Sequence, residues 1–191
     1  MKTIVIDNSK KINAGSCPFS WFLIADSAVS NTGKPFYLPD ENGRILATLS
    51  VAIKISRLGK SISPKFSYRY YSEMAPAVHF YMPDMEKELH EMGLPTDPAH
   101  NFDRALMVGD FIPFKPESEF RLSLNETPAA VFSFTNLFPD IDESISLLSS
   151  FNTLKMGDLI LPGLSDPLAL KQGDLLEIYN NGEKSFIIKI K

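Results

Sequence analysis

Three histidines, the only ones in the chain, lie close together with three acidic residues in the middle of the sequence. Imidazole and carboxylate groups transfer protons near neutral pH, and both also bind metal ions. The stretch therefore predicts one of two things, an acid/base or metal site, or a polar surface. The residues concerned are His79, His90, His100, Asp84, Glu86 and Asp103.

Glu86 and His90 favour the surface alternative. They are four residues apart in the segment 83–93, which begins with proline, has acids in its first turn and ends with Gly93. This order is typical of a helix, and such a pair on a polar helix contributes only about 0.2–0.5 kcal/mol. His79 and His100 remain the candidates for chemistry, and the sequence leaves open whether they meet in space.

Composition excludes several other functions. The net charge of −4 gives no basic surface for nucleic acid. Cys17 is the only cysteine, which excludes an internal disulfide and multi-cysteine metal sites, and it is expected to be a small buried hydrophobe. There is no phosphate-loop motif and no apolar segment of membrane length, so we expect a cytoplasmic protein without a membrane partner.

Alternation of apolar and polar residues predicts a mostly β structure. In the segment 49–56 every second residue from Leu49 to Ile55 is large and apolar, which predicts a strand with one wetter face. Helix start signals predict short helices at residues 63–74, 83–93 and 139–154. The fold class is therefore α+β and β-rich, in one domain over residues 1–191. Further strands are predicted at residues 1–6, 18–29, 75–82, 109–125, 126–138, 159–161 and 175–179.

The end of the chain contains a Lys-x-Gly-Asp-Leu turn twice, at residues 155–159 and 171–175. Each turn precedes a short apolar run, as Gly-Asp turns do before strands. The segment 149–178 resembles the closing stretch of the fumarylacetoacetate hydrolase family in its single-domain form, Thr-Leu-x-x-Gly-Asp-Leu-Ile-x-x-Gly followed by a second Leu-x-x-Gly-Asp. The doubled turn then corresponds to the rim and closing strands of that family's β-roll.

Four more segments resemble the same family in the same order, at residues 18–29, 46–63, 76–86 and 100–112. They are similar to its Phe-Leu-Lys-Pro-Ser-Ser-Ala-Leu strand, its Glu-x-Glu strand, its Asp-Phe-Thr-Ala-Arg-Asp segment and its Lys-x-Phe-Asp segment. The resemblance runs from about Pro18 to the end and leaves residues 1–17 as a short divergent segment. It implies a mixed β-sandwich roll with a few short surface helices.

The resemblance also implies where a metal would bind. The family holds magnesium, manganese or calcium through the two acids of Glu-x-Glu and the Asp before Phe-Thr, since hard cations prefer carboxylates and residues two apart share a strand face. The matching pair here is Thr48 and Ser50, or Ala47 and Leu49 if the register slips by one, and the third position falls on His79. No position carries a carboxylate, so no metal and no cofactor are predicted.

Substrate-binding groups of the family are replaced as well. The lysine of its Phe-Leu-Lys-Pro segment corresponds to Ile24, and the lysine of its Lys-x-Phe-Asp segment corresponds to His100. Of these groups only the Phe-Asp pair, Phe102 and Asp103, is kept. The family's hydrolases activate water with a His and Glu pair near the N-terminus, and the first 21 residues contain neither. The pocket positions implied by the resemblance are Ile24, Thr48, Ser50, Gly163, Leu164 and Ser165.

These replacements predict a catalytically inactive binding or interaction protein, because a catalytic constellation fails when one or two members are lost. One alternative is a divergent hydrolase, isomerase or decarboxylase of 2-oxo or 1,3-dioxo acids that uses His79, His100 and Asp103 as acid/base groups. A second alternative is a sensor for a less charged small molecule.

The family commonly dimerises, so we expect a homodimer or a pairing with a related subunit, with residues 131–134 in the contact. A protein that stays monomeric at every micromolar concentration would contradict this.

Overall fold

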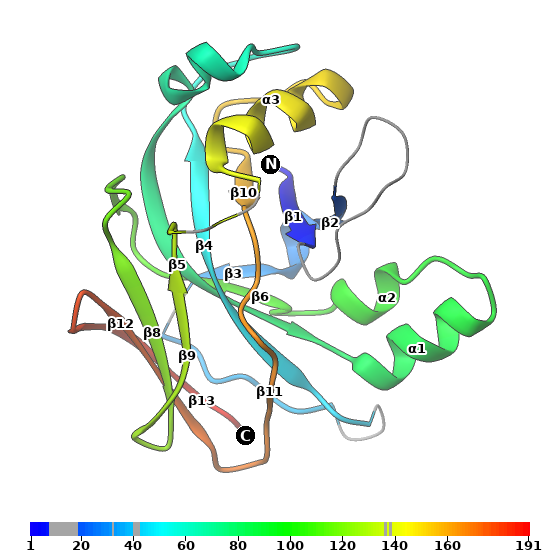
Figure 1. Ribbon diagram of the computed structural model, residues 1–191. Coiled ribbons are helices and arrows are strands. Elements are labelled where there is room, and N and C mark those ends of the chain that lie inside the picture. Colours follow the sequence, from blue (N-terminus) through cyan, green and yellow to red (C-terminus); the bar gives the residue numbers. More distant parts are fainter. Residues whose placement is uncertain (8–18, 32, 40–42, 136, 138) are drawn as a thin grey trace.

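Two β-sheets make up most of the molecule (Figure 1). This computed structural model describes residues 1–7, 19–31, 33–39, 43–135, 137 and 139–191, and Cys17 lies outside that set. The larger sheet is mixed, with the path β2-β1-β10-β4-β5-β6-β3, and β11 and β7 pair with β4 and β5. Its strands are β1 (Thr3–Asp7), β2 (Ser20–Ile24), β3 (Val29–Asn31), β4 (Leu46–Ile55), β5 (Tyr71–Tyr81), β6 (Leu106–Val108), β7 (Ile112–Pro113), β10 (Leu159–Leu161) and β11 (Leu168–Ala169).

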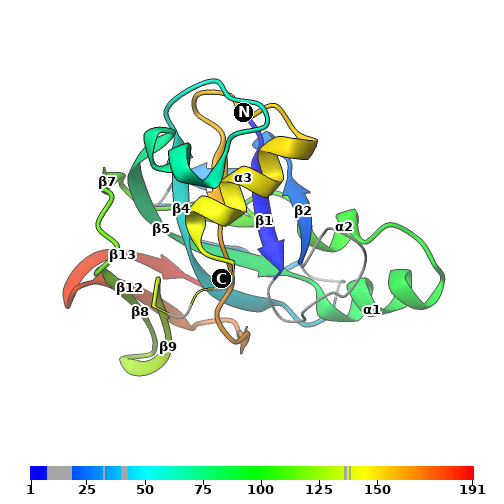
Figure 2. The ribbon, with the colours of Figure 1, turned by 45° about the horizontal axis from the view of Figure 1, so that its top comes forward.

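The smaller sheet is antiparallel, in the order β13-β12-β8-β9, and lies at the opposite side of the molecule from helices α1 and α2 (Figure 1). Figure 2 shows α3 lying across the larger sheet. None of the described helices is long and apolar enough to cross a bilayer. The remaining elements are β8 (Glu119–Leu124), β9 (Thr127–Ser133), β12 (Leu175–Asn180), β13 (Glu183–Lys189), α1 (Pro83–Glu91), α2 (Asp97–His100), α3 (Ile141–Phe151) and the 3-10 helices η1 (Asp26–Ala28) and η2 (Pro64–Arg69).

Strands β4 and β5 form the centre of the structure. They pair antiparallel along almost their whole length, with Thr48 opposite His79 and Ala52 opposite Ala75. One face of this pair, with Leu49 and its neighbours, packs on the smaller sheet and on α3. The other face carries Ala52, which belongs to a second cluster of buried side chains together with residues of the neighbouring strands β1, β6 and β10 and with partly buried rings such as Phe111. Both faces are therefore inside the protein.

The expected wetter face of the strand at residues 49–56 is confirmed only at its end. The strand itself is confirmed, and Lys54 and Ser56 are half-buried, but Ser50 and Ala52 are both 0% exposed. The hydroxyl of Ser50 donates a hydrogen bond to the carbonyl of Gly163 at 2.5 Å, which satisfies this buried polar group.

The β-rich α+β class is confirmed, and the predicted helices differ from the observed ones only in extent. The helices predicted at 83–93 and 139–154 are present as α1 and α3. The helix predicted at 63–74 ends at Arg69, because β5 begins at Tyr71 and takes up the remainder. The short helix α2, which carries His100, was not predicted, since its four residues are too few for a periodic signal.

The smaller sheet has two edge strands, β13 at one end and β9 at the other. Val131 on β9 is 55% exposed and the next residue, Phe132, is buried. A second copy of the chain could pair at such an edge, so the dimer contact expected at residues 131–134 stays a prediction.

The two Gly-Asp turns have the same local structure. In each, the Asp N–H donates to the carbonyl of the Lys three residues earlier, and the glycine before the Asp has a positive φ, +89° at Gly157 and +92° at Gly173. A type II turn requires this conformation at its third residue. The Asp carboxylate then accepts the N–H of the same Lys at 2.7 Å, for Asp158 and for Asp174 alike.

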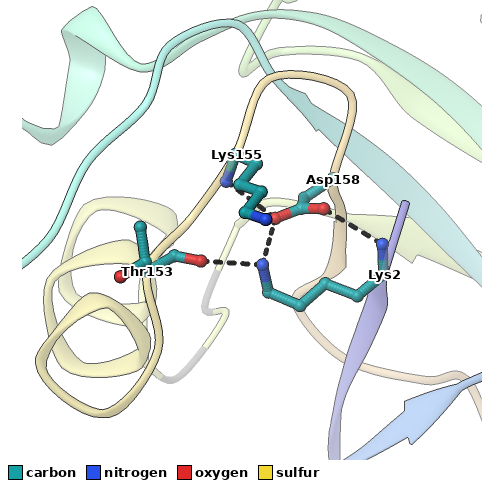
Figure 3. A network of polar contacts seen from close by, with 4 residues as sticks. All are labelled: Lys2, Thr153, Lys155 and Asp158. Carbon is teal, nitrogen blue, oxygen red and sulfur yellow. Dashed lines mark hydrogen bonds and ion pairs between the residues drawn. The ribbon is translucent and has the colours of Figure 1, made fainter.

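The first of these aspartates is also part of a network with the N-terminal strand (Figure 3). Asp158 is 2% exposed and accepts hydrogen bonds from the Lys2 backbone N–H, at 3.0 Å, and from the Lys2 ammonium group. That ammonium group also donates to the carbonyl of Thr153 at 2.8 Å. The carboxylate thus joins the start of β1 to the turn that begins β10, and these two strands pair in parallel.

These contacts change the pKa of Asp158. Burial opposes ionisation, but the hydrogen bonds from Lys2 and from the N–H of Lys155 outweigh it, so the pKa lies below its ordinary value of 3.8. A carboxyl group whose pKa is lower in the folded than in the unfolded state stabilises the fold above pH 3.8. That contribution is lost as the pH falls through the depressed pKa.

We expect Asp158→Asn to lower the free energy of unfolding by about 2–3 kcal/mol at pH 7, because the amide loses the ion pair with Lys2 and places an NH2 group among donors. Urea denaturation followed by circular dichroism measures this. The loss should shrink as the pH falls from 3.8, where the carboxyl group of the unfolded chain takes up a proton, through the lower pKa of Asp158 in the folded protein.

Asp174→Asn is the matched control, since Asp174 caps the second turn of the same type but is more exposed and has no ammonium partner among the described residues. Its cost should be about 1 kcal/mol or less. Equal costs for the two variants would show that the turn alone, and not the network with Lys2, accounts for the stabilisation.

Candidate functional site

A cavity of about 450 Å³ lies where the ends of β4 and β5 meet α1, α2 and the loop before β11. Its volume is in the range of roughly 300–1,000 Å³ in which small-molecule sites usually fall. The described residues that line it are Asp7, Phe22, Thr48, His79, Tyr81, Glu86, His100, Leu164, Ser165, Asp166 and Pro167.

His79 and His100 meet in this cavity, which the sequence had left open. His79 is on β5 opposite Thr48 and is 0% exposed, and His100 ends α2 with 6% exposed. Their ring nitrogens, His79 Nε2 and His100 Nδ1, are 3.4 Å apart, and the rings are nearly parallel at 15°. The two histidines therefore form a direct pair, although 21 residues separate them in the sequence.

Glu86 extends this pair into a chain of three groups. Its Oε1 lies 3.3 Å from His100 Nε2, and its side chain is 40% exposed. The expected surface pair of Glu86 with His90 is wrong: His90 is exposed, and Glu86 turns from α1 toward α2 because the two helices pack together. The Glu86–His100–His79 chain leads from a partly exposed carboxylate to a buried imidazole.

The carboxylate determines which nitrogens carry protons. An ionised Glu86 only accepts hydrogen bonds, so His100 Nε2 is the donor, and in a neutral His100 the other nitrogen, Nδ1, is the acceptor. His79 Nε2 then donates to His100, and a neutral His79 has an unshared electron pair on Nδ1. That atom is buried and has no hydrogen-bond partner in the part of the chain that the structure describes.

The cavity strongly disfavours a positive charge on His79. Burial, and then the neighbouring His100, lower the pKa of His79 to about 3. Burial also raises the pKa of Tyr81, and the carboxylates of Glu86 and Asp7 raise it further. Tyr81 therefore lies in a negative electrostatic field.

Two aromatic rings contact the histidine pair. The centroid of Phe22, from β2, is 4.4 Å from that of His100 and 5.6 Å from that of His79. The ring of Tyr81 is nearly parallel to both imidazoles, with centroids 5.7 Å from His79 and 5.6 Å from His100. These rings restrict the imidazole orientations and give the cavity an apolar, π-rich wall.

Only part of the site implied by the resemblance lines the cavity. Thr48, Leu164 and Ser165 do, and Ser165 accepts the N–H of Leu49 at 2.9 Å. Ser50 and Gly163 are buried behind this surface, where the Ser50 hydroxyl donates a hydrogen bond to the Gly163 carbonyl. Ile24 belongs to the second apolar cluster and is not among the described lining residues.

Asp103 is not among the described residues that line this cavity. It is exposed and borders a separate depression with Tyr37 and Arg104. The structure therefore brings together His79 and His100 and supplies Glu86, not Asp103, as the acidic member of the cluster.

Several lining residues were missed by sequence reasoning. Tyr81 could have been found, because it lies two residues after His79 and a strand directs both side chains to one face. The others come from separate elements, and no local pattern connects them with the histidines. They are Asp7, Phe22, Asp166 and Pro167, together with Glu86 in its observed role.

The residues at the implied metal positions do not fit magnesium, manganese or calcium. Thr48 and Ser50 offer neutral hydroxyls, and each is directed at a backbone carbonyl, of His79 at 3.4 Å and of Gly163 at 2.5 Å. His79 offers a nitrogen where these ions prefer oxygen. Within the described residues, no three His, Cys, Asp or Glu side chains are grouped so that they could hold a metal ion.

Comparison with known proteins shows the fold. No family model matches the chain. The chain is 22% identical to the oxaloacetate tautomerase YcgM of Escherichia coli over 168 residues, covering 84% of this chain and 77% of the relative. It is 24% identical to the mouse mitochondrial oxaloacetate tautomerase FAHD1 over 184 residues, covering 89% and 80%.

Solved structures agree closely along the whole chain. The fumarylpyruvate hydrolase of Pseudomonas aeruginosa, in complex with Mn2+ and pyruvate, superposes with a TM-score of 0.89 at 17% identity, covering 100% of this chain and 89% of that one. A Yersinia pestis structure assigned to the fumarylacetoacetate hydrolase family also gives 0.89, at 21% identity, covering 100% and 92%. The expected fumarylacetoacetate hydrolase-like fold is confirmed.

The pKa of His79 predicts a dependence of stability on pH. Between pH 6.5 and about 3 the unfolded chain binds a proton at His79 and the folded protein does not, so stability falls as the pH is lowered through this window. The contribution of one group is at most about 1.4 kcal/mol per pH unit. We expect His79→Gln to reduce this slope in urea denaturation measured at several pH values.

His90→Gln is the control, because it removes an exposed imidazole and should leave the slope unchanged. The comparison uses the slope with pH and not the absolute stability, which the buried substitution also lowers. Identical slopes in wild type and His79→Gln would show that His79 titrates normally in the folded protein.

Proposed function

We propose that this chain belongs to the fumarylacetoacetate hydrolase family, has lost the family's metal-dependent catalysis, and uses its cavity to bind a small molecule. The similarity to oxaloacetate tautomerases over most of the chain supports the family assignment. The observation that carries the loss of catalysis is the set of groups at the metal positions, two hydroxyls directed at carbonyls and the neutral His79.

Electrostatics supports the same conclusion. A 2-oxo acid is an anion, and a divalent cation would compensate its charge in a metal-dependent enzyme. Here the acids Glu86 and Asp166 line the cavity, and its described lining includes no lysine or arginine. Without a metal, an anionic substrate would meet like charges in a partly desolvated cavity, which disfavours its binding.

Metal titration tests this proposal. Neither Mn2+ nor Mg2+, with or without pyruvate, should raise the melting temperature of the purified protein, because a ligand stabilises a fold only if it binds the folded state. The P. aeruginosa fumarylpyruvate hydrolase is a positive control, since its structure contains Mn2+ and pyruvate. Binding of one manganese ion per chain at micromolar affinity would contradict the proposal.

A second candidate function is metal-free proton transfer on 2-oxo or 1,3-dioxo acids, and the Glu86–His100–His79 chain favours it. His79 Nδ1 would take a proton from substrate carbon while His79 Nε2–H passes its proton to His100 Nδ1, and His100 Nε2–H passes its proton to Glu86. The net result is a protonated Glu86 and two neutral imidazoles. Such a transfer needs no imidazolium, which agrees with the low pKa of His79.

This candidate ranks second because the anionic substrate is disfavoured by the cavity's acids. If it is right, tautomerisation of oxaloacetate should persist with a metal chelator present and should fall about 100-fold in His79→Gln. Glu86→Gln should reduce it as well, and His90→Gln should not, as an ultraviolet assay of the keto and enol forms would measure. Activity that survives in His79→Gln, or that requires added Mn2+, would exclude the relay.

A further inference from the structure

The charge of the cavity points to the class of ligand it accepts. Asp166 is exposed and forms no ion pair within the described residues. Glu86 uses Oε1 for His100, and Oε2 has no described partner. Neither carboxylate is paired with a described lysine or arginine, so the open side of the cavity offers negative charge and hydrogen-bond acceptors to a ligand.

His79 lines the buried end of the cavity. His79 is 0% exposed, and its Nδ1, with the unshared electron pair assigned above, has no described hydrogen-bond partner. A buried polar atom without a partner costs about 1–3 kcal/mol, and a donor from a ligand would remove this cost. This observation is independent of the carboxylates and indicates a ligand with an N–H or O–H group.

The walls between these two ends are aromatic. The rings of Phe22 and Tyr81 both contact the histidine pair. Aromatic faces attract cations and exclude anions, since the face of the ring carries partial negative charge. Carboxylates, rings and a neutral imidazole acceptor together match a positively charged nitrogen that carries hydrogens.

We propose that the cavity binds a small organic cation with N–H donors, such as a protonated primary amine, between Phe22, Tyr81 and the carboxylates of Glu86 and Asp166, with an N–H donated to His79 Nδ1. This inference rests on the proposed binding function and specifies its ligand. The proposed ligand is opposite in charge to oxaloacetate, which appears in the names of the relatives.

Three probes of matched size test the charge preference. Benzylamine is a cation at pH 7, benzyl alcohol is neutral and benzoate is an anion, and all three carry one ring. Isothermal titration of the full chain in chelator should give a dissociation constant for benzylamine at least about tenfold lower than that for benzyl alcohol, with benzoate weakest. Equal or tighter binding of benzyl alcohol or benzoate, or no binding of benzylamine, would overturn the proposal.

Variants locate the binding. Glu86→Gln should weaken benzylamine about three- to tenfold, and Asp166→Asn by less because it is exposed and more screened. Asp103→Asn removes the same charge from an exposed acid beside another depression and should change nothing. His79→Phe should weaken binding as well, and Asp166→Asn keeps the test decisive if that buried variant does not fold. An equal effect of Asp103→Asn would show that the preference for benzylamine comes from the net charge of the protein, and it would overturn the proposed site.

The two proposals fail in different ways. Stabilisation by Mn2+ with pyruvate would contradict the loss of metal chemistry and overturn the amine site with it. No response to metal combined with tighter binding of benzoate than of benzylamine would leave the metal-free binding function and overturn only the ligand class.

Discussion

The antiparallel ladder between β4 and β5 is the constraint on which the rest of the structure depends. It brings Thr48 opposite His79 and keeps both faces of the strand pair inside the protein. One face packs on α3 and the smaller sheet, and the other carries small residues that form a second cluster with side chains of the neighbouring strands β1, β6 and β10. The cavity opens at the end of this same ladder, so the central strands supply part of its wall.

Burial at that position decides the chemistry of His79. Removal from water keeps its imidazole neutral, and the Glu86 carboxylate, through His100, determines which nitrogen carries the proton. The same fold holds Mn2+ and pyruvate in the P. aeruginosa hydrolase, whereas here hydroxyls and an imidazole stand at the positions that the resemblance implies for the metal. The proposed loss of metal chemistry is compatible with the shared fold, because function depends on the groups placed in the site.

The two Gly-Asp turns show how context gives identical local structures different importance. Both have the glycine in the left-handed region and the same 2.7 Å hydrogen bond from the Lys N–H to the Asp carboxylate. Asp158 in addition joins the N-terminal strand through Lys2, whereas Asp174 accepts a hydrogen bond from Asn125 on a more exposed turn. Tertiary burial strengthens the first set of contacts, since charged hydrogen bonds are stronger away from water.

By itself, the sequence determined the features that depend on neighbouring residues. Period-two alternation located the strand at Leu49 to Ile55, capping signals located α1 and α3, and the repeated Gly-Asp turns, with the other family-like segments, indicated the fold. Tertiary structure alone decided that His79 meets His100, that Glu86 and not Asp103 joins them, and that Ser50 is buried. Those contacts join residues on different elements, and their distances depend on strand register and helix packing, which no local pattern encodes.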